Sequence, residues 1–106
     1  MSMIQNTRFD KELMAKLRKE AGAFLKELRN EAGLTQLKLS HTLGYSYYSY
    51  VSQIEGGVNR VPSEAIEDWA RALNVNPSWL ALSLMKYYDP FSYELLAEHI
   101  SVEKRL

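Results

Sequence analysis

The first third of the chain carries a helical pattern of apolar residues. From Leu13 to Leu28, apolar positions recur at intervals of three and four, which places them on one stripe of a helix. Asp10 is a candidate N-cap before this stretch, and Gly33 is a candidate C-terminal glycine after it. Gly22 lies within the pattern, where glycine costs about 1 kcal/mol relative to alanine. The pattern therefore predicts either one long helix or two helices that meet near this glycine.

Two short helices joined by a turn are predicted between Gly33 and Gly57. Thr35 can cap the first of them, and Gly44 ends it. The second helix must bury Val51 and Ile54 against the same core, because these residues are three positions apart. The segment therefore predicts a helix-turn-helix arrangement.

Three further helices are predicted from caps and proline punctuation. Ser63 is a candidate N-cap for a helix with an apolar stripe that includes Trp69. Asn76 and Asp89 are each followed by a proline, which suits the first position of a helix. The last helix would carry Leu95, Leu96 and Ile100.

Five or six short helices with brief connections predict an all-α fold, since no strand-like alternation occurs. We expect a compact five-helix helix-turn-helix domain over residues 21–86. Residues 1–20 would form an N-terminal helical extension, and residues 87–106 a C-terminal one that could serve in dimerisation. The charged end, 103–106, is expected to fray.

Composition narrows the class of protein. The chain has 106 residues and 46% hydrophobic residues, the size and content of one small folded domain. It has no cysteine, no apolar run of membrane-spanning length and no signal-peptide pattern, which predicts a cytoplasmic location. His41 and His99 are isolated histidines and poor metal ligands. No nucleophile–base constellation or phosphate loop occurs, so we expect neither an enzyme nor a cofactor.

Charge weighs mildly against a nucleic-acid partner. Thirteen basic and thirteen acidic side chains cancel, whereas DNA-binding domains usually show a basic excess or a basic face. The distribution of charge matters more than the sum, so DNA remains open as a partner.

Residues 24–84 resemble the XRE family, the phage Cro/repressor type of helix-turn-helix protein. The resemblance rests on these residues: Leu28-Arg29, Gly33-Leu34-Thr35-Gln36, Leu39, Leu43-Gly44, Val51-Ser52-Gln53-Ile54-Glu55, Gly57, Pro62-Ser63, Ala70, Leu73, Val75 and Leu80. Each motif is weak alone, and the combination is specific. It implies that the first helix of the motif braces the second in the major groove of DNA.

The resemblance also implies roles for individual residues. Arg29 and Glu55 correspond to an ion pair beneath the motif in several relatives. The second helix, at about 47–55, would meet base edges, and glutamine suits adenine there. The expected DNA-contacting residues are Thr35, Gln36, Lys38, Tyr47, Tyr48, Ser49, Ser52, Gln53, Asn59 and Arg60.

The sequence departs from the family pattern in three places. The segment from Gly44 to Val51 is one residue longer than usual, so either the turn is longer or the helix starts at Ser46. The second helix lacks the usual basic residue, and the loop after Gly57 is lengthened. Four tyrosines between Tyr45 and Tyr50 could contact DNA, bind a protein or pack on the core.

Two functions follow as expectations. The first is a sequence-specific DNA-binding transcriptional regulator, a repressor, that binds a palindromic operator as a homodimer. The alternative is a protein-binding module of the same fold, an antiactivator or antitoxin that sequesters a toxin or another regulator through the tyrosine-rich face. Candidates for the dimer interface are Leu13, Met14, Leu17, Tyr87, Tyr88, Phe91, Tyr93 and Leu96.

Overall fold

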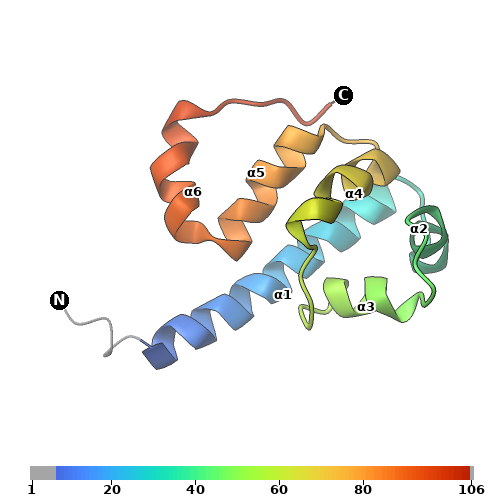
Figure 1. Cartoon of the computed structure of the whole chain (residues 1–106), viewed down its shortest axis with the longest axis horizontal. Coiled ribbons are helices and arrows are strands. Elements are labelled where there is room, and N and C mark those ends of the chain that lie inside the picture. The colour runs from blue at the N-terminus through green and yellow to red at the C-terminus, as the bar shows by residue number, and fades with distance from the viewer. Residues whose placement is uncertain (1–6, 106) are drawn as a thin grey trace.

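The computed structural model describes the backbone of residues 7–105 and the side chains of residues 11–105. All of its regular elements are helical, which confirms the all-α prediction (Figure 1). None of the helices in this part of the chain is long and apolar enough to span a membrane. The elements are α1 (Thr7–Glu31), α2 (Gln36–Thr42), α3 (Ser49–Glu55), a 3-10 turn η2 (Ser63–Ala65), α4 (Ile66–Leu73), α5 (Pro77–Tyr88), α6 (Pro90–Leu96) and a 3-10 turn η3 (Ala97–His99).

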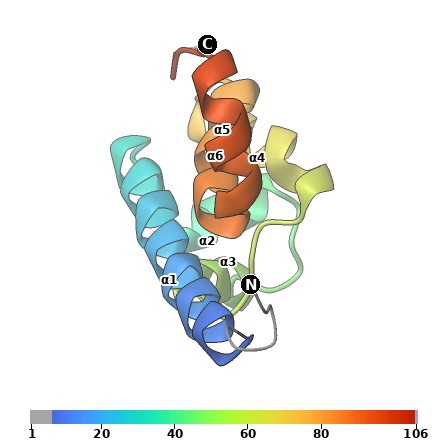
Figure 2. The ribbon, with the colours of Figure 1, turned by 90° about the vertical axis from the view of Figure 1, so that its left-hand side faces the viewer.

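Helix α1 is a single helix of 25 residues, so the interruption at Gly22 does not divide it. It packs against α5 on one side and α3 on another (Figures 1 and 2). A Cβ atom at Gly22 would lie only 2.1 Å from the carbonyl oxygen of Glu55. The glycine therefore permits the C-terminal end of α3 to approach the backbone of α1, which explains a residue of low helix propensity at this position.

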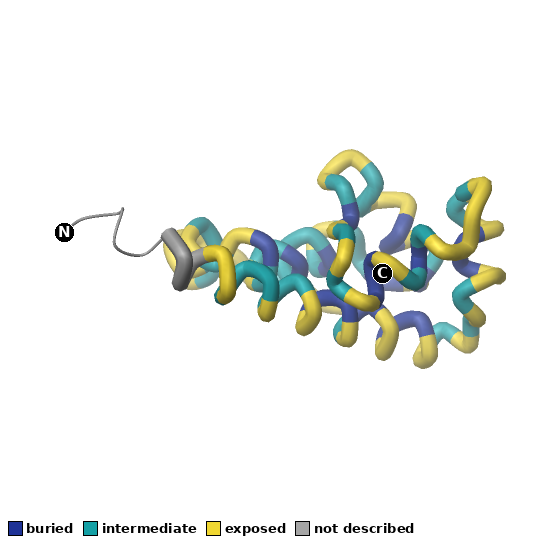
Figure 3. Tube along the Cα trace, turned by 90° about the horizontal axis from the view of Figure 1, so that it is seen from below, coloured by how far each residue is buried: buried dark blue, intermediate teal, exposed yellow. Residues whose placement is uncertain are grey.

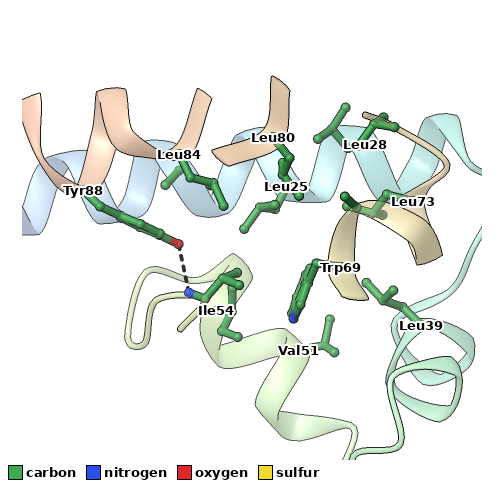
Figure 4. Close-up of a cluster of buried hydrophobic side chains, with 14 residues drawn as sticks. Leu25, Leu28, Leu39, Val51, Ile54, Trp69, Leu73, Leu80, Leu84 and Tyr88 are labelled. Carbon is green, nitrogen blue, oxygen red and sulfur yellow. Dashed lines mark hydrogen bonds between the residues drawn. The ribbon is translucent and has the colours of Figure 1, made fainter. Parts of the chain in front are cut away.

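The core lies between α1, α3, α4 and α5 (Figure 4). Trp69 is fully buried at its centre, and the exposed turns lie on the outside of the fold (Figure 3). Helices as short as α2 and α3 are marginal alone, so this packing is what stabilises them. The buried apolar residues are Ala21, Leu25, Leu28, Leu39, Val51, Ile54, Val61, Trp69, Ala70, Leu73, Val75, Leu80, Leu84 and Tyr88.

Three of the predicted caps are present. The Thr35 hydroxyl accepts from the Lys38 amide at 3.0 Å, Asn76 caps α5, and Asp89 caps α6. The prediction that Ser63 caps a helix is wrong. Ser63 begins the 3-10 turn η2, whose N-cap is Pro62, and no side chain caps it.

The C-terminal segment does not follow its predicted form. Helix α6 ends at Leu96, and Ile100 lies beyond η3 in extended backbone. The expected fraying does not hold at Lys104, which attaches the segment to the fold. Its carbonyl accepts from the Asn76 amide at 2.8 Å, and its ammonium lies 3.1 Å from a Glu31 carboxylate oxygen.

Candidate nucleic-acid interface

The turn between α2 and α3 contains the extra residue of the sequence. Gly44 has a φ of +76°, a left-handed conformation that glycine adopts readily, and it redirects the chain after α2. Helix α3 begins only at Ser49, so the turn is longer and the helix does not start at Ser46. Tyr47 and Tyr48 therefore precede α3 rather than lie within it. The Ser40 hydroxyl donates to the Tyr47 carbonyl at 3.3 Å, which ties the turn to α2.

The four tyrosines divide into two structural classes. Tyr45 and Tyr50 pack edge to face with ring centroids 4.7 Å apart, and the Trp69 indole N–H donates to the Tyr45 hydroxyl at 2.8 Å. Burial raises the pKa of Tyr45 above its ordinary value. By contrast, Tyr47 is 76% exposed and Tyr48 is 59% exposed. The first pair is partly buried against the core, and the second pair presents most of its ring surface to a partner.

A buried ion pair fixes α3 to α1. Arg29 Nε lies 2.6 Å from Glu55 Oε2, and Arg29 Nη2 donates to Glu55 Oε1 at 3.1 Å. Arg29 Nη1 also donates to the Leu34 carbonyl at 2.7 Å. Gln36 joins this network, because its Nε2 donates to Glu55 Oε1 at 3.0 Å. The network places the start of α2 and the end of α3 in one fixed relation.

The outer end of α3 is connected to the following loop. The Asn59 side-chain amide donates to Gln53 Oε1 at 2.8 Å, and the Val58 amide donates to the Gln53 backbone carbonyl at 2.9 Å. Gln53 is exposed, yet both its side chain and its backbone are held by the loop. A side chain held in this way presents its amide in a defined orientation.

Arg60 lies at the far end of that loop. Its guanidinium carbon is 4.3 Å from the centroid of the Tyr88 ring, a cation–π contact. Burial raises the pKa of Tyr88, whose hydroxyl accepts from the Val61 amide at 3.1 Å. Arg60 remains exposed, at the edge of an open cleft of about 530 Å³ between η2, α4 and α5.

The remaining predicted contacts lie around the motif. Thr35, Lys38 and Ser49 are exposed, and Ser52 is half-buried, with its hydroxyl donating to the Ser49 carbonyl at 3.0 Å. The structure thus places Thr35, Gln36 and Lys38 at the start of α2, and Ser49, Ser52 and Gln53 on α3.

Charge on this face differs from charge on the whole chain. Between Gly33 and Ser63 the only acidic residue is Glu55, and it is buried against Arg29. The basic side chains of the same segment, Lys38 and Arg60, are exposed. This segment therefore contributes no exposed carboxylate, although the exposed Asp68 of α4 lies beside Thr42 and Leu43 at the C-terminal end of α2.

Arg18 and Lys19 adjoin this face, although sequence reasoning placed them in an extension outside the domain. Arg18 Nε donates to the Gly57 carbonyl at 3.4 Å, and a Cβ at Gly57 would lie 2.8 Å from Lys19 Cα. Gly22 is the sequence signal that could have located them. A glycine within a helix can mark the point where another helix approaches closely, and the residues one turn earlier then lie at the edge of that contact.

The residues predicted for the dimer interface differ in their exposure. Tyr88 is wrong as a candidate because it is 6% exposed and belongs to the core of its own chain. Tyr87 is half-buried and packs on Phe24 with centroids 5.7 Å apart. Phe91 is 64% exposed and Leu96 is 41% exposed, while Leu13, Met14, Leu17 and Tyr93 are half-buried. The exposed Leu95 and Ile100 belong to the same region and were not among the dimer candidates.

Comparison with protein families gives a match to the central part of the chain. The family model described as a helix-turn-helix domain matches residues 22–83, which cover the C-terminal part of α1, all of α2, α3 and α4, and the first part of α5. Comparisons with curated proteins and with solved structures gave no match. The matched domain is a DNA-binding domain of transcriptional regulators.

Proposed function

We propose that this chain, which belongs to the family of helix-turn-helix domains, is a sequence-specific transcriptional repressor. It would bind a palindromic operator as a homodimer. Helix α3 would enter the major groove, and α2 would lie across the phosphate backbone. We place its action in the cytoplasm.

The observation that carries this proposal is that the segment from Gly33 to Ser63 contributes no exposed carboxylate. Glu55 is buried and paired, so a phosphate backbone would meet hydroxyls, amides and the cations Lys38 and Arg60. Like charges opposed across an interface cost several kcal/mol, and this segment avoids that cost. Net neutrality therefore does not argue against DNA here.

Each group on this face has a defined chemical role in the proposal. Gln53, oriented by Asn59, can donate to N7 and accept from N6 of adenine in the major groove. Tyr48 and Ser49, at the start of α3, can contact thymine methyls or phosphates. The exposed N-terminus of α2, capped by Thr35, offers backbone amides to a phosphate.

Dimerisation would place two α3 helices one turn of DNA apart. The exposed apolar residues Phe91, Leu95 and Leu96 on α6 are the best candidates for the contact between copies, because they cover no core of their own chain. Their position outside the matched domain leaves the α3 face free for DNA.

One observation favours the alternative, a module that binds another protein. Helix α3 carries no basic side chain, and the exposed rings of Tyr47 and Tyr48 are the type of residue enriched at the centre of protein interfaces. An antitoxin or antiactivator would use these rings to hold a toxin or another regulator.

A salt series separates the two functions. The promoter DNA upstream of the coding sequence is titrated with the protein at increasing salt, using fluorescence anisotropy. We expect affinity to fall linearly on a double-logarithmic plot as counterions are released. Gln53→Ala should relax sequence preference by about 1–3 kcal/mol at one base position, whereas Arg60→Ala should weaken all sequences similarly. If the protein ignores this DNA at low salt yet retains a partner protein, the repressor proposal fails.

A further inference from the structure

The N-terminal half of α1 extends past the end of α3 and has no counterpart in the matched domain. The family match begins at residue 22, whereas α1 begins at Thr7. Figure 1 shows this half of the helix, in blue, running beyond the end of α3 and its following loop. The stripe of α1 that meets α3 therefore continues into a region where α3 no longer covers it.

Two contacts fix which stripe that is. Gly22 lies against the Glu55 carbonyl, and Arg29, seven residues and two turns later, pairs with the Glu55 carboxylate. Counting backward from Gly22 at helical spacing, the same stripe contains Lys19 and Arg18 one turn earlier and Lys11 three turns earlier.

The continued stripe is basic. Lys11 and Lys19 are exposed, and Arg18 is half-buried beside the Gly57 carbonyl. Around the helix from Gly22, Lys11 lies about 20° away, Arg18 about 40° and Lys19 about 60°. Glu20 lies about 160° away, on the far side, whereas Glu12 lies about 80° away, next to the edge that carries Lys19. Lys16 lies about 120° away and belongs to another face.

We propose that Lys11, Arg18 and Lys19 on α1 form a second DNA contact, which holds duplex phosphates beyond those reached by α2 and α3. Lys19 and Arg18 border the loop that carries Asn59 and Arg60, so the basic stripe is continuous with the proposed DNA face. Phosphate contacts fix the position of a protein on the duplex without reading sequence. This inference rests on the proposed DNA-binding function and extends its footprint.

The test removes charge from the stripe without touching the motif. Lys11→Gln/Lys19→Gln leaves Arg18 and its contact with the Gly57 carbonyl intact. The matched control, Lys16→Gln/Lys86→Gln, removes the same charge from exposed positions off the stripe. Each protein binds a mixed-sequence duplex about three helical turns long, over a salt series. Circular dichroism confirms that both variants keep the helical content of the wild type.

We expect the stripe variant to reduce the slope of log affinity against log salt by about 2, close to one unit for each lost phosphate contact. The control should keep the wild-type slope. If the stripe variant and the control have equal slopes, the second contact is overturned and the proposed function stands. If the wild type itself does not bind the duplex at low salt, both the second contact and the proposed DNA-binding function are contradicted.

Discussion

Helices α3 and α6 have seven residues each, and they are stabilised in opposite ways. Helix α3 has no side-chain cap, but it buries Val51, Ile54 and Glu55 and is fixed to α1 through Arg29. Helix α6 has a local cap from Asp89 and a proline at its start, and none of its residues is buried. The first is fixed by buried side chains, whereas the second lies against α5 with only partly buried side chains and a local cap at its start.

This difference separates their surfaces as well. Because α3 is anchored from beneath, its outer side can carry polar groups such as Gln53 and Ser49 in fixed positions. Helix α6 instead exposes Phe91, Leu95 and Leu96, and contiguous exposed apolar groups mark interaction surfaces. A rigid polar face suits base recognition, and an apolar face suits a second copy of the chain.

The largest expected effect comes from removing the anchor of α3. Arg29→Met should cost about 3–5 kcal/mol of unfolding free energy, because it leaves the Glu55 carboxylate buried without its partner. Chemical denaturation measures the loss. Arg71→Met, which breaks the exposed pair with Glu67, should cost no more than about 0.5 kcal/mol. Equal losses in the two variants would contradict the anchoring role.

Closing the space between α1 and α3 should have the next largest effect. Gly22→Ala places a methyl group on the Glu55 carbonyl, a backbone atom that cannot move aside cheaply, and should cost roughly 3 kcal/mol. Thermal unfolding measures this change. Glu27→Ala, at an exposed site of the same helix, should leave the melting temperature nearly unchanged. A stable Gly22→Ala protein would show that the helices do not meet so closely.

Substitutions on α6 should weaken the association of two chains rather than destabilise the fold of one chain. Phe91→Ser combined with Leu95→Ser removes exposed apolar groups, so the unfolding free energy of one chain should change by less than about 0.5 kcal/mol per site. Sedimentation should show the dimer dissociating to monomers. A variant that remains dimeric would move the contact to another surface, such as the half-buried Leu13 and Leu17.

The smallest effect is a pH dependence confined to α6. Hydrogen bonds from Ser92 lower the pKa of Asp89 below its usual value. The stabilisation from this cap is therefore complete above the ordinary carboxyl pKa, about 3.9, and is lost as pH falls through the lower folded value. Hydrogen exchange should show α6 loosening in acid before α3. Asp89→Asn can cap the helix without titrating, so this variant should lose the acid sensitivity of α6. If α6 of the variant still loosens in acid, another group is responsible.

The elements of the motif could be predicted from sequence because their signals are local. Thr35, Asn76 and Asp89 act as caps through atoms two or three residues away. The sequence left open whether α1 was divided, because the reason for Gly22 lies on Glu55, far along the chain. The role of Lys104 could not be predicted either, because its partner Asn76 is distant in the sequence. The four tyrosines could not be sorted into packed and exposed residues from sequence, because the hydrogen bond from Trp69 to Tyr45 is also a long-range contact.

Selection of DNA by the whole protein tests the central claim most directly. A random duplex library is incubated with the protein at low salt, and the retained sequences are determined over several rounds. The account predicts an enriched motif with twofold symmetry, and Gln53→Ala should lose preference at one position of each half-site while keeping the others. Recovery of no enriched sequence by the wild type, or an unchanged motif with Gln53→Ala, would contradict recognition through the outer face of α3.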